Sequence, residues 1–165
     1  MTYEFGAKEI VKGSGYISRQ CCGSTEIELG TVYAAEMGIT LLSDIDRYTL
    51  EDAQVTLVFH LVLADGSVED VPMGVFEVSE ANRLAKCLEL KAYDFMLRFD
   101  KSFNGFETVG TAYDFIALCC KRCKVEFANK RAEIDAMPNG GVTLSVYTEN
   151  DIETCRDVLF YVAQV

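Results

Sequence analysis

Residues 54–78 constrain the fold more than any other part of the chain, because they have the pattern of a β-hairpin. Residues 54–63 are rich in Val, Leu and Phe, which is typical of a strand. Asp65-Gly66 follows, and glycine supplies the positive φ that a tight hairpin turn needs. Residues 68–78 then return along the first strand. The pattern predicts an antiparallel pair and a sheet-dominated fold.

The two strands of this hairpin differ in what they predict for their neighbours. Strand 54–63 is largely apolar on both faces, so we expect it to be central in its sheet and covered by a second layer or by a partner chain. Strand 68–78 contains Pro72, which has no backbone N–H to donate to a ladder. We therefore expect this stretch to lie at an edge or to contain a bulge.

The rest of the chain adds strands mainly before the hairpin and helices after it. A charged loop is expected at residues 43–52. Helix 111–124 has a capping-box-like start at Thr111-Ala112-Tyr113-Asp114, and helix 152–164 starts after Asn150, with Asp151 and Glu153 in its first turn. We predict an α+β, β-dominated fold with domains 1–107 and 108–165, the second a helix-strand-helix segment. Further strands are predicted at 16–22, 25–29, 37–42, 84–93 and 142–146.

Charge and hydropathy exclude several classes of function. The chain has 15 basic and 26 acidic residues, a net charge of −11, so it repels phosphate backbones and anionic membrane surfaces. Half of its residues are hydrophobic, which is typical of a folded chain. No apolar run approaches the ~20 residues of a membrane span, and the first residues lack the pattern of a signal peptide. We predict neither nucleic-acid binding nor membrane insertion.

The seven cysteines leave two interpretations open. Cys120-Lys121-Arg122-Cys123 has the C-x2-C spacing of a zinc site, to which Cys119, Cys21 and Cys22 are the further candidate ligands. Alternatively, Cys119 and Cys123 lie four residues apart on a predicted helix and belong to its apolar stripe, where free cysteine packs as a small hydrophobe. Cys87 and Cys155 have the same packing interpretation. We favour packing and predict no metal ligand.

Catalytic patterns are missing from the sequence. His60 is the single histidine, and its apolar neighbours in strand 54–63 favour a structural role. The sequence contains no recognisable set of nucleophile, general base and orienting group, and no glycine-rich phosphate loop. We therefore predict a protein that is not an enzyme, with no catalytic residue and no cofactor.

Five segments, in order, resemble the N-terminal part of phage tail hub proteins, the baseplate-hub or tail-associated proteins of phages and prophages. The resemblance covers roughly residues 16–165. The first segment begins at Ile17-Ser18-Arg19-Gln20-Cys21-Cys22, continues with Ile27-Glu28-Leu29-Gly30-Thr31-Val32 and leads into Ala35-Glu36-Met37-Gly38-Ile39-Thr40-Leu41. The others are Val71-Pro72-Met73-Gly74-Val75-Phe76-Glu77-Val78, Leu88-Glu89-Leu90-Lys91-Ala92-Tyr93-Asp94-Phe95-Met96, the stretch 97–103, and Thr154-Cys155-Arg156-Asp157-Val158-Leu159 with the rest of its helix.

The resemblance implies a barrel-like antiparallel sheet domain with two attached helices, which assembles without catalysis at the tip of the tail tube. It implies self-association into a ring, a trimer in the full-length protein, and contacts with other tail proteins. The protein would be found in the virion tail, and in the host cytoplasm before assembly. Hub modules continue past a position like Val165, so residues 108–165 would either start a second hub subdomain or pack on the barrel. Two alternatives remain: a bacterial β-rich interaction or ligand-binding module, and a zinc-binding protein that uses the Cys120-x2-Cys123 region.

Overall fold

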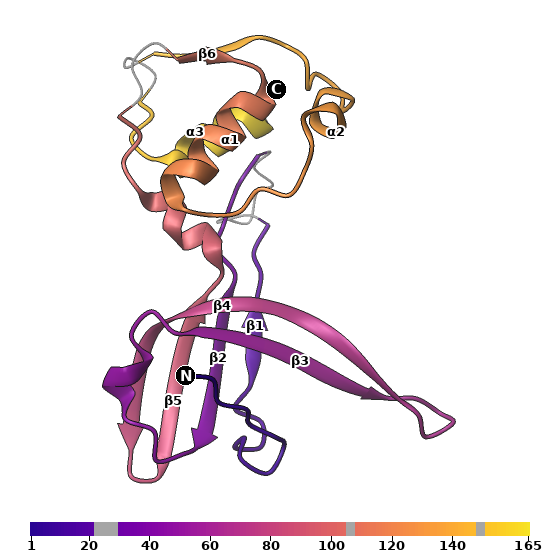
Figure 1. The fold of residues 1–165 in the computed structure, drawn as a ribbon, viewed down its shortest axis with the longest axis vertical. Helices are drawn as coiled ribbons and strands as arrows, with labels where there is room; N and C mark the ends of the chain where they lie inside the picture. Colours follow the sequence, from indigo (N-terminus) through magenta and orange to yellow (C-terminus); the bar gives the residue numbers. More distant parts are fainter. Residues whose placement is uncertain (22–29, 105–107, 148–150) are drawn as a thin grey trace. The chain divides into compact units, whose positions relative to one another are not determined.

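The structure is a computed structural model, which describes residues 1–21, 30–104, 108–147 and 151–165. The chain forms two compact units (Figure 1). The first consists of Met1–Arg19 and Ala34–Phe95, and the second of Gln20–Tyr33 and Met96–Val165. The strand predicted at 25–29 lies outside the described residues. The proposed domains 1–107 and 108–165 remain a prediction about which parts fold independently.

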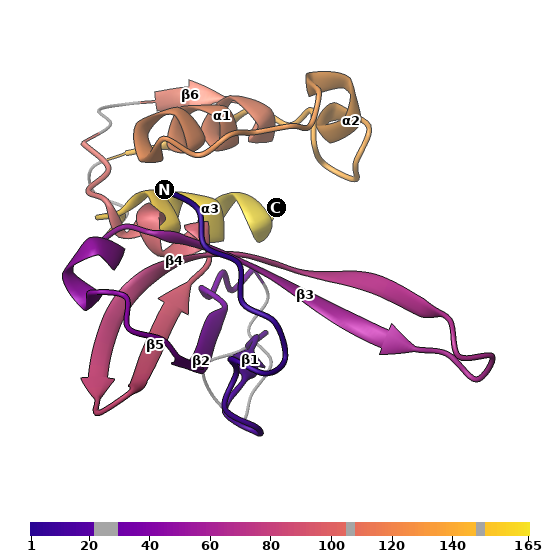
Figure 2. The ribbon, with the colours of Figure 1, turned by 60° about the horizontal axis from the view of Figure 1, so that its bottom comes forward.

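The first unit is a curled, antiparallel half-barrel sheet of five strands (Figure 2), which confirms the β-dominated α+β fold. Its strand order is β1-β2-β5-β4-β3. A 3-10 helix, η1 (Arg47–Leu50), interrupts the predicted charged loop. The strands are β1 (Tyr16–Ser18), β2 (Glu36–Leu42), β3 (Gln54–Val62), β4 (Val68–Leu84) and β5 (Cys87–Tyr93).

One face of this sheet forms the core of the first unit. Residues on β2 alternate as predicted, so that Met37, Ile39 and Leu41 are all buried. Their partners in the β2–β5 register are Ala92, Leu90 and Leu88, which are buried as well. From β4, Phe76 and Val78 complete the core.

Of three sequence predictions about these strands, two need correction and one is confirmed. Among the described residues β3 pairs only with β4, so it is an edge strand and not central as predicted. Apolar side chains on both faces call for cover of the faces and do not require a second hydrogen-bonded neighbour. β4 runs on to Leu84, so the next strand begins at Cys87 and not at 84, after a turn in which Ala85 has a φ of 55°. The bulge expected near Pro72 is confirmed between Leu57 and Val58 of the ladder.

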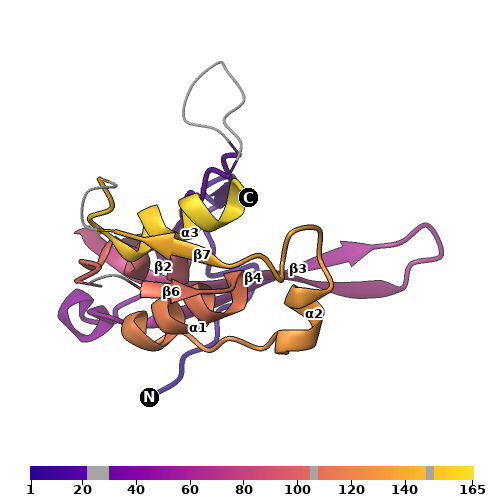
Figure 3. The same ribbon diagram turned by 90° about the horizontal axis from the view of Figure 1, so that it is seen from above.

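The second unit has helices and a two-stranded sheet around a separate core (Figure 3). The capping box of Thr111 and Asp114 is present at the start of its first helix, as predicted. The last helix begins at Cys155 and not directly after Asn150, because Asp151 has a φ of 52°, which a right-handed helix cannot include. The elements are η2 (Phe95–Asp100), which starts at the last residue of the first unit, β6 (Thr108–Gly110), α1 (Ala112–Cys123), α2 (Arg131–Asp135), β7 (Leu144–Val146) and α3 (Cys155–Ala163).

Among the described residues, no helix has the length and apolar character needed to cross a membrane.

Candidate functional site: an uncovered apolar arm

The part of the β3–β4 hairpin beyond the bulge, Val58–Pro72, projects past the rest of its sheet, as Figure 2 shows; we call it the distal arm. β5 pairs with β4 only from Glu77 onward, so no other strand continues beside the arm among the described residues. At the bulge, the carbonyl oxygen of Met73 accepts a hydrogen bond of 2.7 Å from the guanidinium of Arg19. The arm is therefore a two-stranded ribbon with a fixed base.

The tip of the arm is the predicted hairpin turn. Gly66 has a φ of 82°, the conformation for which glycine is suited. The carboxylate of Asp65 accepts hydrogen bonds from the backbone N–H of Ser67 at 2.9 Å and from its hydroxyl at 2.6 Å. These bonds, the hydroxyl one most, lower the pKa of Asp65. The N–H of Leu63 donates to the carbonyl of Ser67 at 2.8 Å and closes the loop.

Apolar side chains are exposed on both faces of the distal arm. Phe59 and Leu61 follow Val55 and Leu57 on the face that forms the core nearer the base, since alternate residues of a strand share a face. On the opposite face, Val62 pairs with Val68 across the ribbon. Clusters of this kind on a soluble protein mark interaction surfaces. The exposed apolar residues of the arm are Val58, Phe59, Leu61, Val62, Leu63 and Val68.

The single histidine also lies on this arm. Nδ1 of His60 lies 2.5 Å from Oδ1 of Asp70, its cross-strand partner, and both side chains are about two-thirds exposed. The geometry is that of a surface pair on a ribbon.

The two edge strands of the sheet differ in length, since β1 has three residues and β3 has nine. On β1, the ring of Tyr16 lies over Gly38, and its hydroxyl donates a hydrogen bond of 2.6 Å to the carboxylate of Glu36. This bond is the main reason why the pKa of Glu36 is lowered. The outer edge of β3 has no strand beside it in the described residues, and β3 contains no Asp, Glu, Lys or Arg. Unpaired edges of this length are templates for pairing with another chain.

The cysteines predicted as candidate ligands are separated by the fold. Cys119, Cys120 and Cys123 of α1 are buried in the core of the second unit, whereas Cys21 is exposed. Cys22 lies outside the described residues. Cys155 of α3 is buried in the same core cluster as the α1 thiols, which the spacing did not indicate because Cys155 is distant in sequence. Among the residues that the structure describes, no three His, Cys, Asp or Glu side chains are arranged to hold a metal ion.

The segment Thr154-Cys155-Arg156-Asp157, part of the family resemblance, has a structural role. Thr154 and Asp157 form a capping box at the start of α3. Burial alone would raise the pKa of Asp157, but hydrogen bonds from Thr154 and Glu153 outweigh this effect and lower the pKa. Arg156 donates to the carbonyls of Val32 and Met96, and its Nε lies 2.6 Å from Oδ1 of Asp100. The motif therefore holds α3 to two other segments of the second unit.

Comparison with known proteins gives no match. No family model, no curated protein and no solved structure is detectably similar to this chain.

Proposed function

We propose that the protein is a structural component of a phage or prophage tail, a hub or baseplate protein at the tip of the tail tube, which acts by assembly and not by catalysis. Support comes from the sequence resemblance over residues 16–165 and from the half-barrel sheet. The single observation that carries the proposal is the uncovered apolar arm, because a surface of this kind needs a partner in the working protein.

A second copy of the chain is the partner that we propose for the arm. The chain has a net charge of −11, so most contacts between two copies bring like charges together. β3 is an exception, since its nine residues include no acidic side chain. Contact along β3 would join copies where repulsion is weakest and would cover both the open edge and the apolar side chains. We propose that β3 of each copy lies against a different surface of the next copy, so that the contacts run head to tail and close into a ring, a trimer in the full-length protein.

Light scattering with two matched variants tests this assembly. Val62 on the arm is 68% exposed, and Leu84 at the far end of β4, where β4 pairs with β5, is 70% exposed. We expect the wild type and Leu84→Glu to assemble as protein concentration rises, and Val62→Glu to remain a monomer because it places a charge in the contact. A wild type that is monomeric at high concentration, or a Val62→Glu variant that assembles normally, would contradict the proposal.

A bacterial β-rich interaction module unrelated to phage is the second candidate, because an apolar arm suits that role equally. The gene neighbourhood separates the two. Genes for a tape-measure protein and a distal tail protein beside this one are expected for a tail hub. Their absence, together with absence of the protein from purified tails, would leave the interaction module.

The zinc alternative has a direct test of its own. Burial, followed by the charge of Cys155, raises the pKa of Cys120, and burial also raises the pKa of Cys123, to about 11. Both shifts disfavour the thiolate that zinc requires. We expect metal analysis of protein purified without chelator to find less than about half an equivalent of zinc. A full equivalent would favour the zinc-binding protein.

A further inference from the structure

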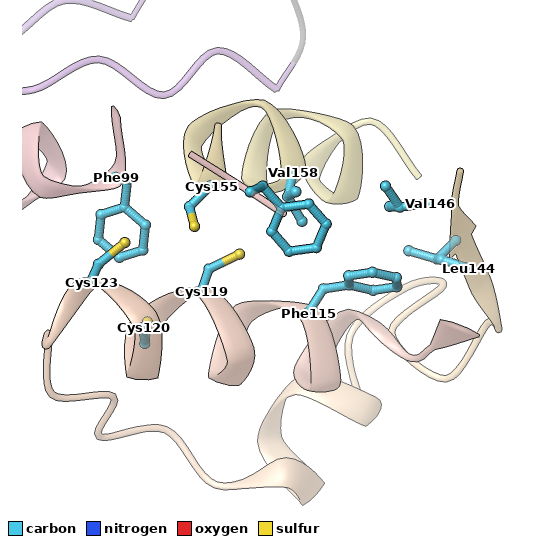
Figure 4. Packing of buried hydrophobic residues seen from close by; sticks show 10 residues of the cluster. Phe99, Phe115, Cys119, Cys120, Cys123, Leu144, Val146, Cys155 and Val158 are labelled. Carbon is cyan, nitrogen blue, oxygen red and sulfur yellow. The ribbon is translucent and has the colours of Figure 1, made fainter. Parts of the chain in front are cut away.

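Three buried thiols converge between the helices of the second unit. Figure 4 shows the side chains of Cys119 and Cys123 pointing from α1 toward α3, and that of Cys155 pointing back from α3. All three residues belong to one buried core cluster of the second unit. Cys119 and Cys155 are fully buried, and Cys123 is nearly so. The three residues form what we call the thiol cluster.

Helix geometry restricts which of these thiols can bond covalently. Cys119 and Cys123 are four residues apart on α1, and the Cβ atoms of such a pair are ~5–6 Å apart. A disulfide needs Cβ atoms ~3.8 Å apart, so these two do not bridge without distorting the helix. Cys155 approaches both from a different helix. It is therefore the common partner of the two α1 thiols.

We propose that the thiol cluster is a redox site, in which Cys155 forms a reversible disulfide with Cys119 or Cys123 and so links α3 to α1. The third thiol remains free and can exchange with the bond. This inference does not depend on the proposed tail function. Cys120 takes no part, because it follows Cys119 directly on α1 and therefore lies about 100° further round the helix.

The reacting partner is a small disulfide, such as oxidised glutathione. A thiolate of the cluster attacks one sulfur of the oxidant and releases one glutathione thiolate, which leaves a mixed disulfide on the protein. A second cluster thiolate then attacks the protein sulfur of that mixed disulfide and releases the second glutathione. Two protein thiols are oxidised, one small disulfide is reduced to two thiols, and the two protons pass to the released glutathione.

The reaction requires opening of the second unit. Burial is the main cause that raises the pKa of Cys119 and Cys123, followed by their contact with Cys155, so the thiolate is scarce in the closed state. α3 has nine residues and provides one side of the cluster. Local separation of α3 would expose the thiols to solvent and to the oxidant. We expect oxidation to be slow in buffer and faster in urea below the unfolding transition.

Trypsin separates Cys155 and Cys123 from each other and from Cys119 and Cys120, and the Cys120→Ala variant then distinguishes the last two. It yields Cys119 and Cys120 in residues 102–121, Cys123 in the dipeptide 123–124, and Cys155 in residues 132–156. Protein oxidised with glutathione in mild urea is digested without reduction and analysed by mass spectrometry. We expect residues 132–156 joined to 102–121 or to 123–124.

Cys120→Ala is the matched control, because Cys120 is buried on the same helix and lies outside the cluster. This variant should form the same linked peptides, and Cys155→Ala should form neither. Oxidation should raise the melting temperature of the wild type by roughly 10 °C, and reduction should reverse the rise. The proposal fails if Cys155 stays reduced or glutathionylated while exposed Cys21 has reacted, or if Cys155 is linked to Cys120, Cys21 or Cys22.

Discussion

The two halves of the β3–β4 hairpin have similar apolar content and opposite surroundings. Near the base, Val55 faces Phe76 across the ladder, and both belong to the core of the first unit. Beyond the bulge, Phe59 and Leu61 lie on the same face of β3 and are exposed. The difference teaches that apolar alternation predicts a strand and its inward face, but not what covers that face.

Strand length is the physical origin of this difference. β4 has 17 residues and β5 has 7, so β5 reaches only part of its neighbour. The apolar face continues along the hairpin after β5 has ended. A protein that uses this uncovered part of the apolar face in assembly needs no additional helix or strand for its interface.

Removing one phenylalanine from each half gives the largest expected contrast. Phe76 is 1% exposed and Phe59 is 55% exposed. We expect Phe76→Ala to lower the free energy of unfolding by about 3–5 kcal/mol, because it leaves a cavity. Phe59→Ala should cost less than about 1 kcal/mol in dilute monomer. Urea unfolding followed by circular dichroism measures both, and equal losses would show that the arm is packed within the monomer.

The bulge that separates the halves is tested by Gly74→Ala. Gly74 has a φ of 133°, and a Cβ there would lie 3.2 Å from the Phe76 ring. We expect a loss of about 1–3 kcal/mol from the strained backbone. Gly15→Ala is the control, because nothing lies within 4 Å of its Cβ and its φ is not positive; it should change stability by less than about 0.5 kcal/mol. A harmless Gly74→Ala would mean that the arm has no fixed base.

His60→Gln tests whether the exposed pair of His60 and Asp70 contributes to the stability of the distal half. Exposed ion pairs contribute little, so we expect urea unfolding of this variant to differ from that of the wild type by less than about 0.5 kcal/mol. Glu69→Gln, an exposed neighbour on the same ribbon, serves as the comparison variant. A much larger loss for His60→Gln alone would show that the pair with Asp70 helps to hold the arm together.

The smallest expected effect is at the tip and depends on pH. The pKa of Asp65 is lowered in the folded state, so its bonds to Ser67 contribute fully above about pH 4 and are lost as pH falls through the lowered pKa. We expect the amide of Ser67 to exchange faster at low pH, after correction for intrinsic exchange, while amides near the base keep their protection. Asp65→Asn should remove this pH dependence, and its persistence would assign the effect to another group.

Local signals predicted much of the fold. Asp65-Gly66 marked the turn, Pro72 the bulge, and Thr111 with Asp114 the start of α1, because each depends on a few neighbouring residues. The position of β3 at the edge was not predictable from its composition, since burial depends on strands far along the chain. The convergence of Cys155 with Cys119 was missed for the same reason: helix periodicity relates residues within α1 and says nothing of α3.

The central claim, that a second copy covers the distal arm, is tested most directly by hydrogen–deuterium exchange at low and high protein concentration. We expect the amides of residues 58–71 to exchange more slowly at high concentration, because the open edge of β3 becomes paired and the ribbon is covered. The amides of β5, which is paired with a strand on each side, should be unchanged. Equal exchange of the arm at every concentration would contradict the claim.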